Sequence, residues 1–226
     1  MAELIIALDL PSELEALRLL DRIPDARWVK VGSILMTRAG PSLLHELRAR
    51  GLQIFLDLKW HDIPNTVAAA VEAAGAVGVA MATVHTLGGP AMMRAAAQAA
   101  GHELGLVGVT VLTSLGPDEL AATLGRDSVV VLEEVTRLAS SAARSGLRGV
   151  VCSALEAAPV RQALGPEAWI VVPGIRRPSD ATGDQVRTAT PASAVAAGAT
   201  HIVVGRPILS AQDPAEVFHE MSGLAA

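Results

Sequence analysis

The stretch QIFLDLKWHDIPNT, residues 53–66, decides the fold. It begins with an apolar, β-prone segment, Gln53 to Leu58, and passes through charged residues to Pro64 and Asn65, where a helix is expected to begin. A buried strand followed within a few residues by a helix start is half of a βαβ unit. The stretch therefore predicts a parallel sheet covered by helices.

The same alternation continues along the whole chain. Strands are expected at residues 4–8, 28–32, 53–58, 79–84, 106–111, 149–152, 169–172 and 201–205. Helices are expected at about 12–22, 41–50, 65–76, 90–101, 130–145, 154–164, 190–198 and 213–222. Eight units in 226 residues match the roughly 30-residue βαβ repeat. We therefore predict an α/β protein with a (β/α)8 TIM barrel fold, in which residues 1–226 form a single domain; an open doubly wound sheet fits less well.

The composition excludes several classes of partner. Hydrophobic residues make up 51% of the sequence but aromatic residues only 2%. The interior is therefore expected to be packed from Ala, Val, Leu and Ile, and aromatic cages or base-stacking platforms are nearly excluded. The net charge is −5, and the basic residues form no run. Nucleic acid is not an expected partner.

Cysteine content and hydropathy predict the compartment. The single cysteine, Cys152, cannot form an intramolecular disulfide, and residues 1–10 have neither the basic region nor the apolar length of a signal peptide. The longest low-charge stretch, residues 73–84, is about two-thirds of the roughly 18 residues that a membrane-spanning helix needs. A cytoplasmic protein without a membrane segment is expected.

Charged residues occur near the carboxyl ends of the first three predicted strands. Asp9 ends the first, Lys30 lies inside the second, and Asp57 and Lys59 point to the same face of the third because strand side chains alternate. Barrel active sites lie at these strand ends, and alternating charges would form a network in which each carboxylate keeps its neighbouring ammonium charged. A salt-bridge layer with only a structural role is the alternative interpretation; four such residues favour an active site.

Two glycine-containing turns later in the chain predict a phosphate site. The seventh strand runs into Pro173-Gly174-Ile175-Arg176, and the eighth ends at Gly205-Arg206. Barrels frequently bind phosphate in these two loops, and Arg206 can bind it through two hydrogen bonds. The polar segment from Arg176 to Gln185 is expected to form a closing lid, with an inert surface loop as the alternative.

Other catalytic chemistries fit the sequence less well. His61 and His85 lack His-x-His or Cys-x-x-Cys spacing, and Lys59 would repel a cation, so no metal site is expected. Cys152 is interpreted as a small buried hydrophobe. No serine has a partnered His and Asp at a spacing typical of a hydrolase triad.

Residues 57–66 resemble the hallmark of the orotidine 5'-phosphate decarboxylase family, Asp-x-Lys-x-x-Asp followed by Ile-Pro-Asn-Thr. Further segments that resemble the family follow in family order over nearly the whole chain: Ala7-Leu8-Asp9, Val29-Lys30-Val31-Gly32, Val111-Leu112-Thr113-Ser114, Pro173-Gly174-Ile175-Arg176, Gly183-Asp184-Gln185 and Val204-Gly205-Arg206-Pro207-Ile208. The resemblance implies a barrel enzyme that converts orotidine 5'-phosphate to uridine 5'-phosphate and carbon dioxide, the final step of de novo UMP biosynthesis, without a metal or cofactor.

The resemblance also implies roles for the charged residues. Asp9 and Lys30 would contact the ribose hydroxyls and join the network. Asp57 would lie beside the substrate carboxylate, and Lys59 would donate a proton to carbon 6 of the pyrimidine. Asp62 would act with Asp57 in keeping Lys59 protonated.

Three positions imply a second subunit. In the family, Asp62, Ile63 and Thr66 reach the active site of the neighbouring subunit, so the resemblance implies a homodimer with shared sites.

The remaining implied contacts concern the base and the phosphate. Thr113, or Ser114 beside it, would address the pyrimidine edge. The phosphate would be held by Arg176, Gln185, Gly205 and Arg206. Arg177 leaves open which of two adjacent arginines reaches the phosphate.

Two other functions are compatible with this scaffold. A sugar-phosphate decarboxylase or aldolase of the same barrel superfamily resembles the chain at Asp-x-Lys-x-x-Asp but uses a magnesium ion; residues 62–66 and 183–185 follow the nucleotide pattern instead. A catalytically silent nucleotide-phosphate sensor is the second alternative. It would be expected to lose the charged network first, and all four members are present.

Overall fold

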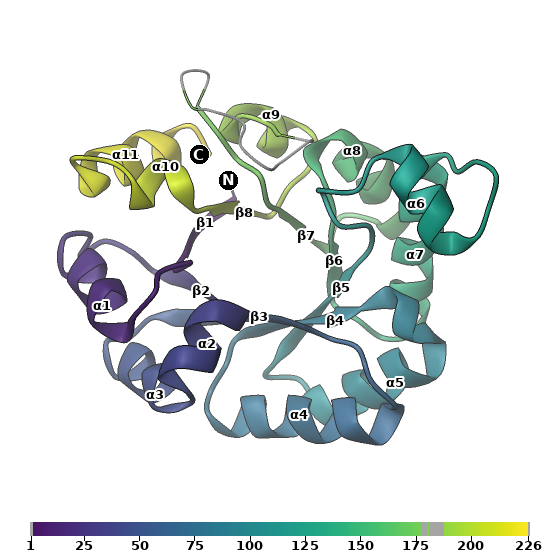
Figure 1. Ribbon diagram of the computed structural model, residues 1–226, viewed down its shortest axis with the longest axis horizontal. Coiled ribbons are helices and arrows are strands. Elements are labelled where there is room, and N and C mark those ends of the chain that lie inside the picture. Colours follow the sequence, from purple (N-terminus) through teal and green to yellow (C-terminus); the bar gives the residue numbers. More distant parts are fainter. Residues whose placement is uncertain (1, 178–179, 181–187, 226) are drawn as a thin grey trace.

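The computed structural model describes residues 2–177, 180 and 188–225. Within them, eight parallel strands pair in chain order and close into a barrel, because β1 pairs with both β2 and β8 (Figure 1). The strands are β1 (Glu3–Ala7), β2 (Trp28–Gly32), β3 (Gln53–Trp60), β4 (Met81–His85), β5 (Gly105–Val109), β6 (Gly149–Val151), β7 (Trp169–Val172) and β8 (His201–Val204). The predicted (β/α)8 barrel is confirmed.

Helices surround the barrel on its outside (Figure 1). They are α1 (Glu13–Asp21), α2 (Ser33–Ala39), α3 (Ser42–Ala49), α4 (Pro64–Ala76), the short 3₁₀ helix η1 (Thr86–Gly88), α5 (Gly89–Ala100), α6 (Pro117–Leu124), α7 (Val131–Arg144), α8 (Ala154–Leu164), α9 (Pro191–Ala196), α10 (Arg206–Leu209) and α11 (Pro214–Gly223). The eight predicted helices are all present. The prediction missed α2, α6, α10 and the 3₁₀ helix η1, which have 7, 8, 4 and 3 residues.

Several helices begin where the sequence supplies a cap. The side chains of Ser12, Ser153, Thr190 and Asp213 each accept a hydrogen bond from a backbone N–H in the first turn of the following helix. Proline occupies the first turn of α4, α5, α6 and α11, where its missing N–H costs nothing. These local signals explain why the predicted helix starts are accurate.

The centre of the barrel differs from the expected composition. Trp28, Phe55 and Trp169 pack there with smaller aliphatic side chains. The expectation of an interior packed from Ala, Val, Leu and Ile holds for most residues of both layers, and the barrel centre adds Phe55, Met81 and the two partly buried tryptophans. Gly105 makes room for one of these rings, because a Cβ there would lie 2.2 Å from the Trp169 ring. Gly149 makes room for the backbone of Trp169, because a Cβ there would lie 1.9 Å from the Trp169 carbonyl oxygen.

The carboxyl end of β3 pairs irregularly with β4. The register passes from Leu56 opposite Ala82 to Trp60 opposite Val84, so that residues 57–59 face a single residue of β4. Lys59 has a φ of 51° and is the one non-glycine residue with positive φ among the described residues. The predicted strand end at residue 58 is therefore corrected to Trp60, and the irregular part carries two of the predicted site residues.

The two ends of the described chain lie side by side. The backbone N–H of Ala2 donates to the carbonyl oxygen of Ala225 at 2.9 Å. Nowhere in the described segments is a helix long and apolar enough to cross a membrane.

Candidate active site

A pocket of about 620 Å³ opens at the carboxyl ends of the strands. This volume lies within the range of small-molecule sites in proteins. Predicted site residues that line it are Asp9, Lys30, Asp57, Lys59, Thr113, Arg176, Gly205 and Arg206. The fold thus brings together residues from both ends of the sequence.

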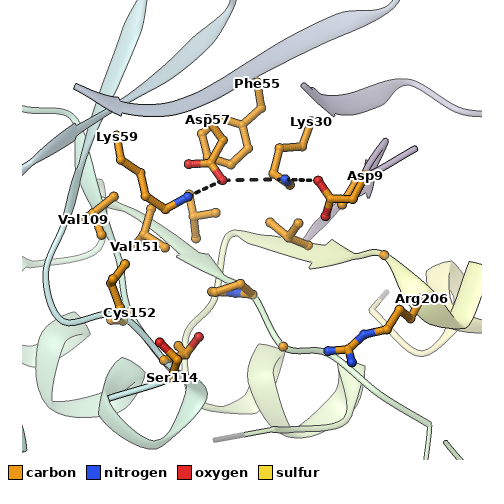
Figure 2. Close-up of a pocket in the computed structure, with 18 of the residues that line it drawn as sticks. Asp9, Lys30, Phe55, Asp57, Lys59, Val109, Ser114, Val151, Cys152 and Arg206 are labelled. Atoms are coloured by element: carbon orange, nitrogen blue, oxygen red, sulfur yellow. Dashed lines mark hydrogen bonds and ion pairs between the residues drawn. The ribbon is translucent and has the colours of Figure 1, made fainter. Parts of the chain in front are cut away.

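Four charged side chains form a row across this pocket (Figure 2). The ammonium Nζ of Lys30 lies 2.8 Å from Oδ1 of Asp9 and 3.7 Å from Oδ2 of Asp57. The Nζ of Lys59 lies 2.8 Å from the same Oδ2 of Asp57. Each charge therefore has a neighbour of opposite sign, as the alternation along the sequence predicts.

Burial differs along the row. The side chains of Lys30 and Asp57 are only 11% and 12% exposed, whereas that of Lys59 is 40% exposed. The inner pair is largely removed from water and depends on its partners for stability. Lys59 remains accessible to a small molecule in the pocket.

Lys30 and Lys59 are the two lysines of the sequence, and the other 16 basic residues are arginines. An ammonium is a compact charge that can give up its proton, whereas a guanidinium stays protonated. Both side chains with this chemistry lie in the pocket.

An apolar wall borders the charged row. Val109, Val151 and Cys152 line the pocket on the side of Lys59, and Phe55 lies by Asp57 (Figure 2). Cys152 is buried, as its interpretation as a small hydrophobe predicts. Such a wall excludes water on one side, and a fixed charge acts more strongly on a ligand where water is excluded.

The two predicted phosphate turns line the opposite part of the pocket, and Figure 2 shows Arg206 across from Lys59. Arg176 lines the pocket and is 7% exposed. Arg177 forms ion pairs with Asp180 and Glu220 and does not appear in the pocket wall. Of the two adjacent arginines, Arg176 is thus the one that lines the pocket.

Most of the predicted lid lies outside the described residues, Gln185 included. The start of this segment is paired with the chain beyond it, since the backbone N–H of Arg176 donates to the carbonyl oxygen of Ala189 at 2.9 Å. Burial acts to raise the pKa of Asp180, but hydrogen bonds from Arg177 together with its charge keep that pKa below its ordinary value.

Three predicted site residues lie away from the pocket of their own chain. Asp62, Ile63 and Thr66 are exposed where α4 begins, and none of them belongs to the pocket wall. The Asp62 carboxylate accepts a hydrogen bond from the N–H of Ile63 at 2.6 Å, and Ile63 is 66% exposed.

Two histidines lie at the end of β3 and of β4. The rings of His61 and His85 stack with centroids 5.4 Å apart. Burial lowers the pKa of His85, and the charges of His61 and Lys59 lower it further. In the part of the chain that the structure describes, no three His, Cys, Asp or Glu side chains gather so that they could hold a metal ion.

The pyrimidine-edge prediction retains both of its candidates, because Thr113 and Ser114 both line the pocket. Sequence reasoning missed Thr83, whose hydroxyl is hydrogen-bonded to the Asp57 carboxylate and to the backbone N–H of Lys59. A threonine in an apolar strand is typical of any β-sheet, so the sequence carries no signal that would single it out.

The chain is similar to known proteins over nearly its whole length. The family model described as "Orotidine 5'-phosphate decarboxylase / HUMPS family" matches residues 2–221. A protein of Chromohalobacter salexigens named orotidine 5'-phosphate decarboxylase is 50% identical over 215 residues, which cover 93% of this chain and 90% of the relative. One of the same name from Halorhodospira halophila is 49% identical over 215 residues, covering 94% and 91%.

Two solved structures are similar to this chain over nearly its whole length. The crystal structure of orotidine 5'-phosphate decarboxylase from Lactobacillus acidophilus is similar over 100% of this chain and 99% of that one, with a TM-score of 0.89 and 36% identity. An uncharacterized conserved protein from Geobacillus kaustophilus is similar over 99% of this chain and 100% of that one, with a TM-score of 0.85 and 34% identity.

Proposed function

Since this chain belongs to the orotidine 5'-phosphate decarboxylase / HUMPS family, we propose that the charged pocket of its barrel performs the reaction for which its relatives are named. The chain is an enzyme, an orotidine 5'-phosphate decarboxylase, and its reaction yields uridine 5'-phosphate and carbon dioxide in pyrimidine biosynthesis. In this proposal residues 1–226 act as one barrel domain in the cytoplasm.

Lys59 is the group that stabilises the reacting carbon and then protonates it. When the bond between carbon 6 and the carboxylate breaks, its electron pair stays in an sp² orbital that the ring π-system does not delocalise. A fixed ammonium next to that carbon stabilises the pair electrostatically. The proton of Nζ then forms the new C–H bond, and the resulting neutral amine of Lys59 regains a proton from water.

The other charged residues hold Lys59 and the substrate. Asp57, 2.8 Å from the Lys59 ammonium, fixes that ammonium and lies beside the substrate carboxylate. Lys30 and Asp9, whose charged atoms are 2.8 Å apart, contact the ribose hydroxyls. Ligand orientation of this kind lowers the barrier because the reacting groups meet already aligned.

The phosphate is bound at the far side of the pocket. Arg176, Gly205 and Arg206, which line that side, hold it together with Gln185, and the segment from Arg176 to Gln185 closes over it. Binding energy from a group remote from carbon 6 is used to orient the ring and to exclude water.

The active unit is a homodimer that shares residues between its sites. Ile63 is 66% exposed, so its side chain is available for contact with a partner subunit. Asp62 and Thr66 lie beside it and do not line their own pocket. In a twofold dimer these three residues complete the neighbouring pocket, where Asp62 adds a second carboxylate beside Lys59.

The observation that carries this proposal is the Lys59 ammonium held 2.8 Å from Asp57 at the wall of the pocket. The test is a spectrophotometric assay of orotidine 5'-phosphate decarboxylation, with and without chelator. We expect turnover in both conditions. We expect Lys59→Ala to lose about 1,000-fold or more in kcat while it still binds uridine 5'-phosphate.

A matched control removes a positive charge elsewhere. Arg144→Ala alters an exposed side chain in the last turn of α7 and should retain wild-type turnover. Near-normal turnover by Lys59→Ala would refute the mechanism. Tight binding of uridine 5'-phosphate without turnover by the native chain would indicate a sensor, and loss of turnover with chelator would indicate the magnesium-dependent alternative.

A further inference from the structure

We propose that Thr83 is a positioning residue for this reaction, which holds both the carboxylate of Asp57 and the backbone of Lys59 in place. The inference rests on the proposed function, because it assigns Thr83 to the same site. Nothing in the sequence pattern distinguishes Thr83 from an ordinary strand residue.

Thr83 is buried behind the charged row and does not line the pocket. It is in β4, between Met81 and His85 on the inward face, and it is 0% exposed. It is absent from the pocket wall, whereas Asp57 and Lys59 belong to that wall. An effect of Thr83 on turnover would therefore pass through these two residues.

One hydroxyl joins the two groups. The backbone N–H of Lys59 donates to Oγ1 of Thr83 at 2.8 Å, and Oγ1 of Thr83 donates to Oδ1 of Asp57 at 3.1 Å. The direction of both bonds is fixed by chemistry, because an N–H can only donate and an ionised carboxylate can only accept. The threonine hydroxyl therefore acts both as an acceptor and as a donor of a hydrogen bond.

The irregular pairing of β3 and β4 explains why a side chain is needed here. Residues 57–59 face Thr83 alone, so the regular backbone ladder is interrupted. Lys59 also has a φ of 51°, a conformation that non-glycine residues adopt only when their surroundings hold them in it. The hydrogen bond to Thr83 is one contact that stabilises this conformation.

The same hydroxyl orients the Asp57 carboxylate. With Oδ1 bound by Thr83, Oδ2 faces the ammonium groups of Lys59, at 2.8 Å, and Lys30, at 3.7 Å. Rotation of this carboxylate would change both ion pairs at once. Since catalysis by a fixed charge depends on its position relative to the reacting carbon, small displacements of Lys59 should lower kcat.

Neighbouring buried threonines serve a different purpose. Oγ1 of Thr86 donates to the carbonyl oxygen of Val109 at 2.8 Å, and Oγ1 of Thr110 donates to that of Val151 at 2.9 Å. Both satisfy a buried hydroxyl with a backbone acceptor. Thr86 is therefore a matched control: it is a buried threonine close to Thr83 whose bond ends on a backbone carbonyl.

The first experiment compares Thr83→Val with Thr86→Val. Valine has nearly the shape of threonine but makes no hydrogen bond. We expect Thr83→Val to lower kcat by about 10- to 100-fold, with KM and the affinity for uridine 5'-phosphate changed less than about threefold. Thr86→Val should keep wild-type kcat. An equal fall in kcat for the two variants, or an effect on KM alone, would overturn the proposal.

A second pair covers the case in which Thr83→Val does not fold. Thr83→Ser and Thr83→Ala both lack the methyl group and differ only in the hydroxyl. We expect the serine variant to retain most of kcat and the alanine variant to lose as much as valine does. Equal kcat values for serine and alanine would exclude a role for the hydroxyl.

Crystal structures separate this proposal from the proposed function. If the native chain fails to decarboxylate orotidine 5'-phosphate, the proposed function is wrong, and the positioning role is then decided by geometry. We expect Thr83→Ala to show a rotated Asp57 carboxylate and a displaced Lys59 Nζ. An unchanged distance of 2.8 Å between them would overturn the role of Thr83.

Discussion

Arg176 and Arg177 are adjacent in the chain but face different surroundings: Arg176 is buried in the pocket wall, and Arg177 forms ion pairs with Asp180 and Glu220 outside it. We expect Arg176→Met to raise KM for orotidine 5'-phosphate by about 10- to 100-fold, because a charge-assisted bond to phosphate contributes about 1.5–3 kcal/mol. Arg177→Met should change KM by less than about threefold. Steady-state kinetics of the two variants decide between them, and a larger effect for Arg177 would transfer the phosphate contact to it.

Replacement of Lys30 distinguishes a catalytic network from a salt-bridge layer with only a structural role. Lys30→Met leaves the carboxylates of Asp9 and Asp57 without the cation between them. We expect kcat/KM to fall by about 100-fold or more, because a fixed charge at the substrate is lost. Lys30→Arg should recover only part of this loss, since a planar guanidinium does not reproduce a point charge. Full activity of Lys30→Met would support the structural interpretation.

Shared active sites predict rescue between two inactive proteins. Lys59→Ala damages the pocket of its own chain, whereas Asp62→Ala damages the pocket of the neighbour. Mixed dimers then contain one intact site, so an equal mixture after subunit exchange should reach about a quarter of wild-type activity. A mixture of Lys59→Ala with Lys30→Met is the control, because both lesions lie in their own pockets. Absence of rescue in the first mixture would exclude shared sites.

His201 should make stability depend on pH. It lies buried between Trp28 and Trp169, and burial, with the charge of Arg148, lowers its pKa from 6.5 to about 4. Between these two values the unfolded chain binds a proton that the folded protein does not bind. The free energy of unfolding should therefore fall by up to about 3 kcal/mol as the pH drops from about 6.5 to about 4.

Urea unfolding of His201→Gln measures this contribution. The variant cannot take up the proton, so its free energy of unfolding should decline less than that of the native chain between pH 7 and pH 5. An identical decline in both proteins would show that His201 is not responsible.

Gly149, which lies against the backbone of Trp169, should tolerate no side chain. At Gly149 a Cβ would lie 1.9 Å from a backbone oxygen, so Gly149→Ala should lower the free energy of unfolding by about 1–3 kcal/mol or more. Gly75, inside α4, has nothing within 4 Å of its Cβ position. Gly75→Ala should raise stability by about 0.5–1 kcal/mol. Urea titration of both variants tests the contrast, and equal stabilities would contradict it.

The parts of the fold that could be predicted are those with strong local signals. Buried strands such as 28–32 and 169–172 are short apolar runs, and the structure has them at the predicted bounds. The charged row could be found in the same way, because Lys30 and Asp57 interrupt apolar strands. Charges in such places are costly unless they are paired, so they stand out in the sequence.

What could not be predicted depends on contacts between distant segments. The interruption of the β3–β4 ladder and the positive φ of Lys59 follow from how two strands meet, and no local residue preference encodes them. The proposed role of Thr83 depends on which groups its hydroxyl contacts, and composition does not show this. Arg177 points away from the pocket in part because it pairs with Glu220, which is 43 residues away in the chain. Which of the two arginines lines the pocket is therefore not visible in the local sequence.

The distribution of lysine has a consequence for covalent modification of this protein. Its two lysines both lie in the pocket, so an acylating metabolite that reacts with lysine side chains has no harmless surface position to attack. Lys59, at 40% exposure, is the more accessible of the two, and Lys30 is 11% exposed. The fraction of chains with an acylated lysine should therefore equal the fraction of inactivated sites. Bound nucleotide should protect the lysines from acylation.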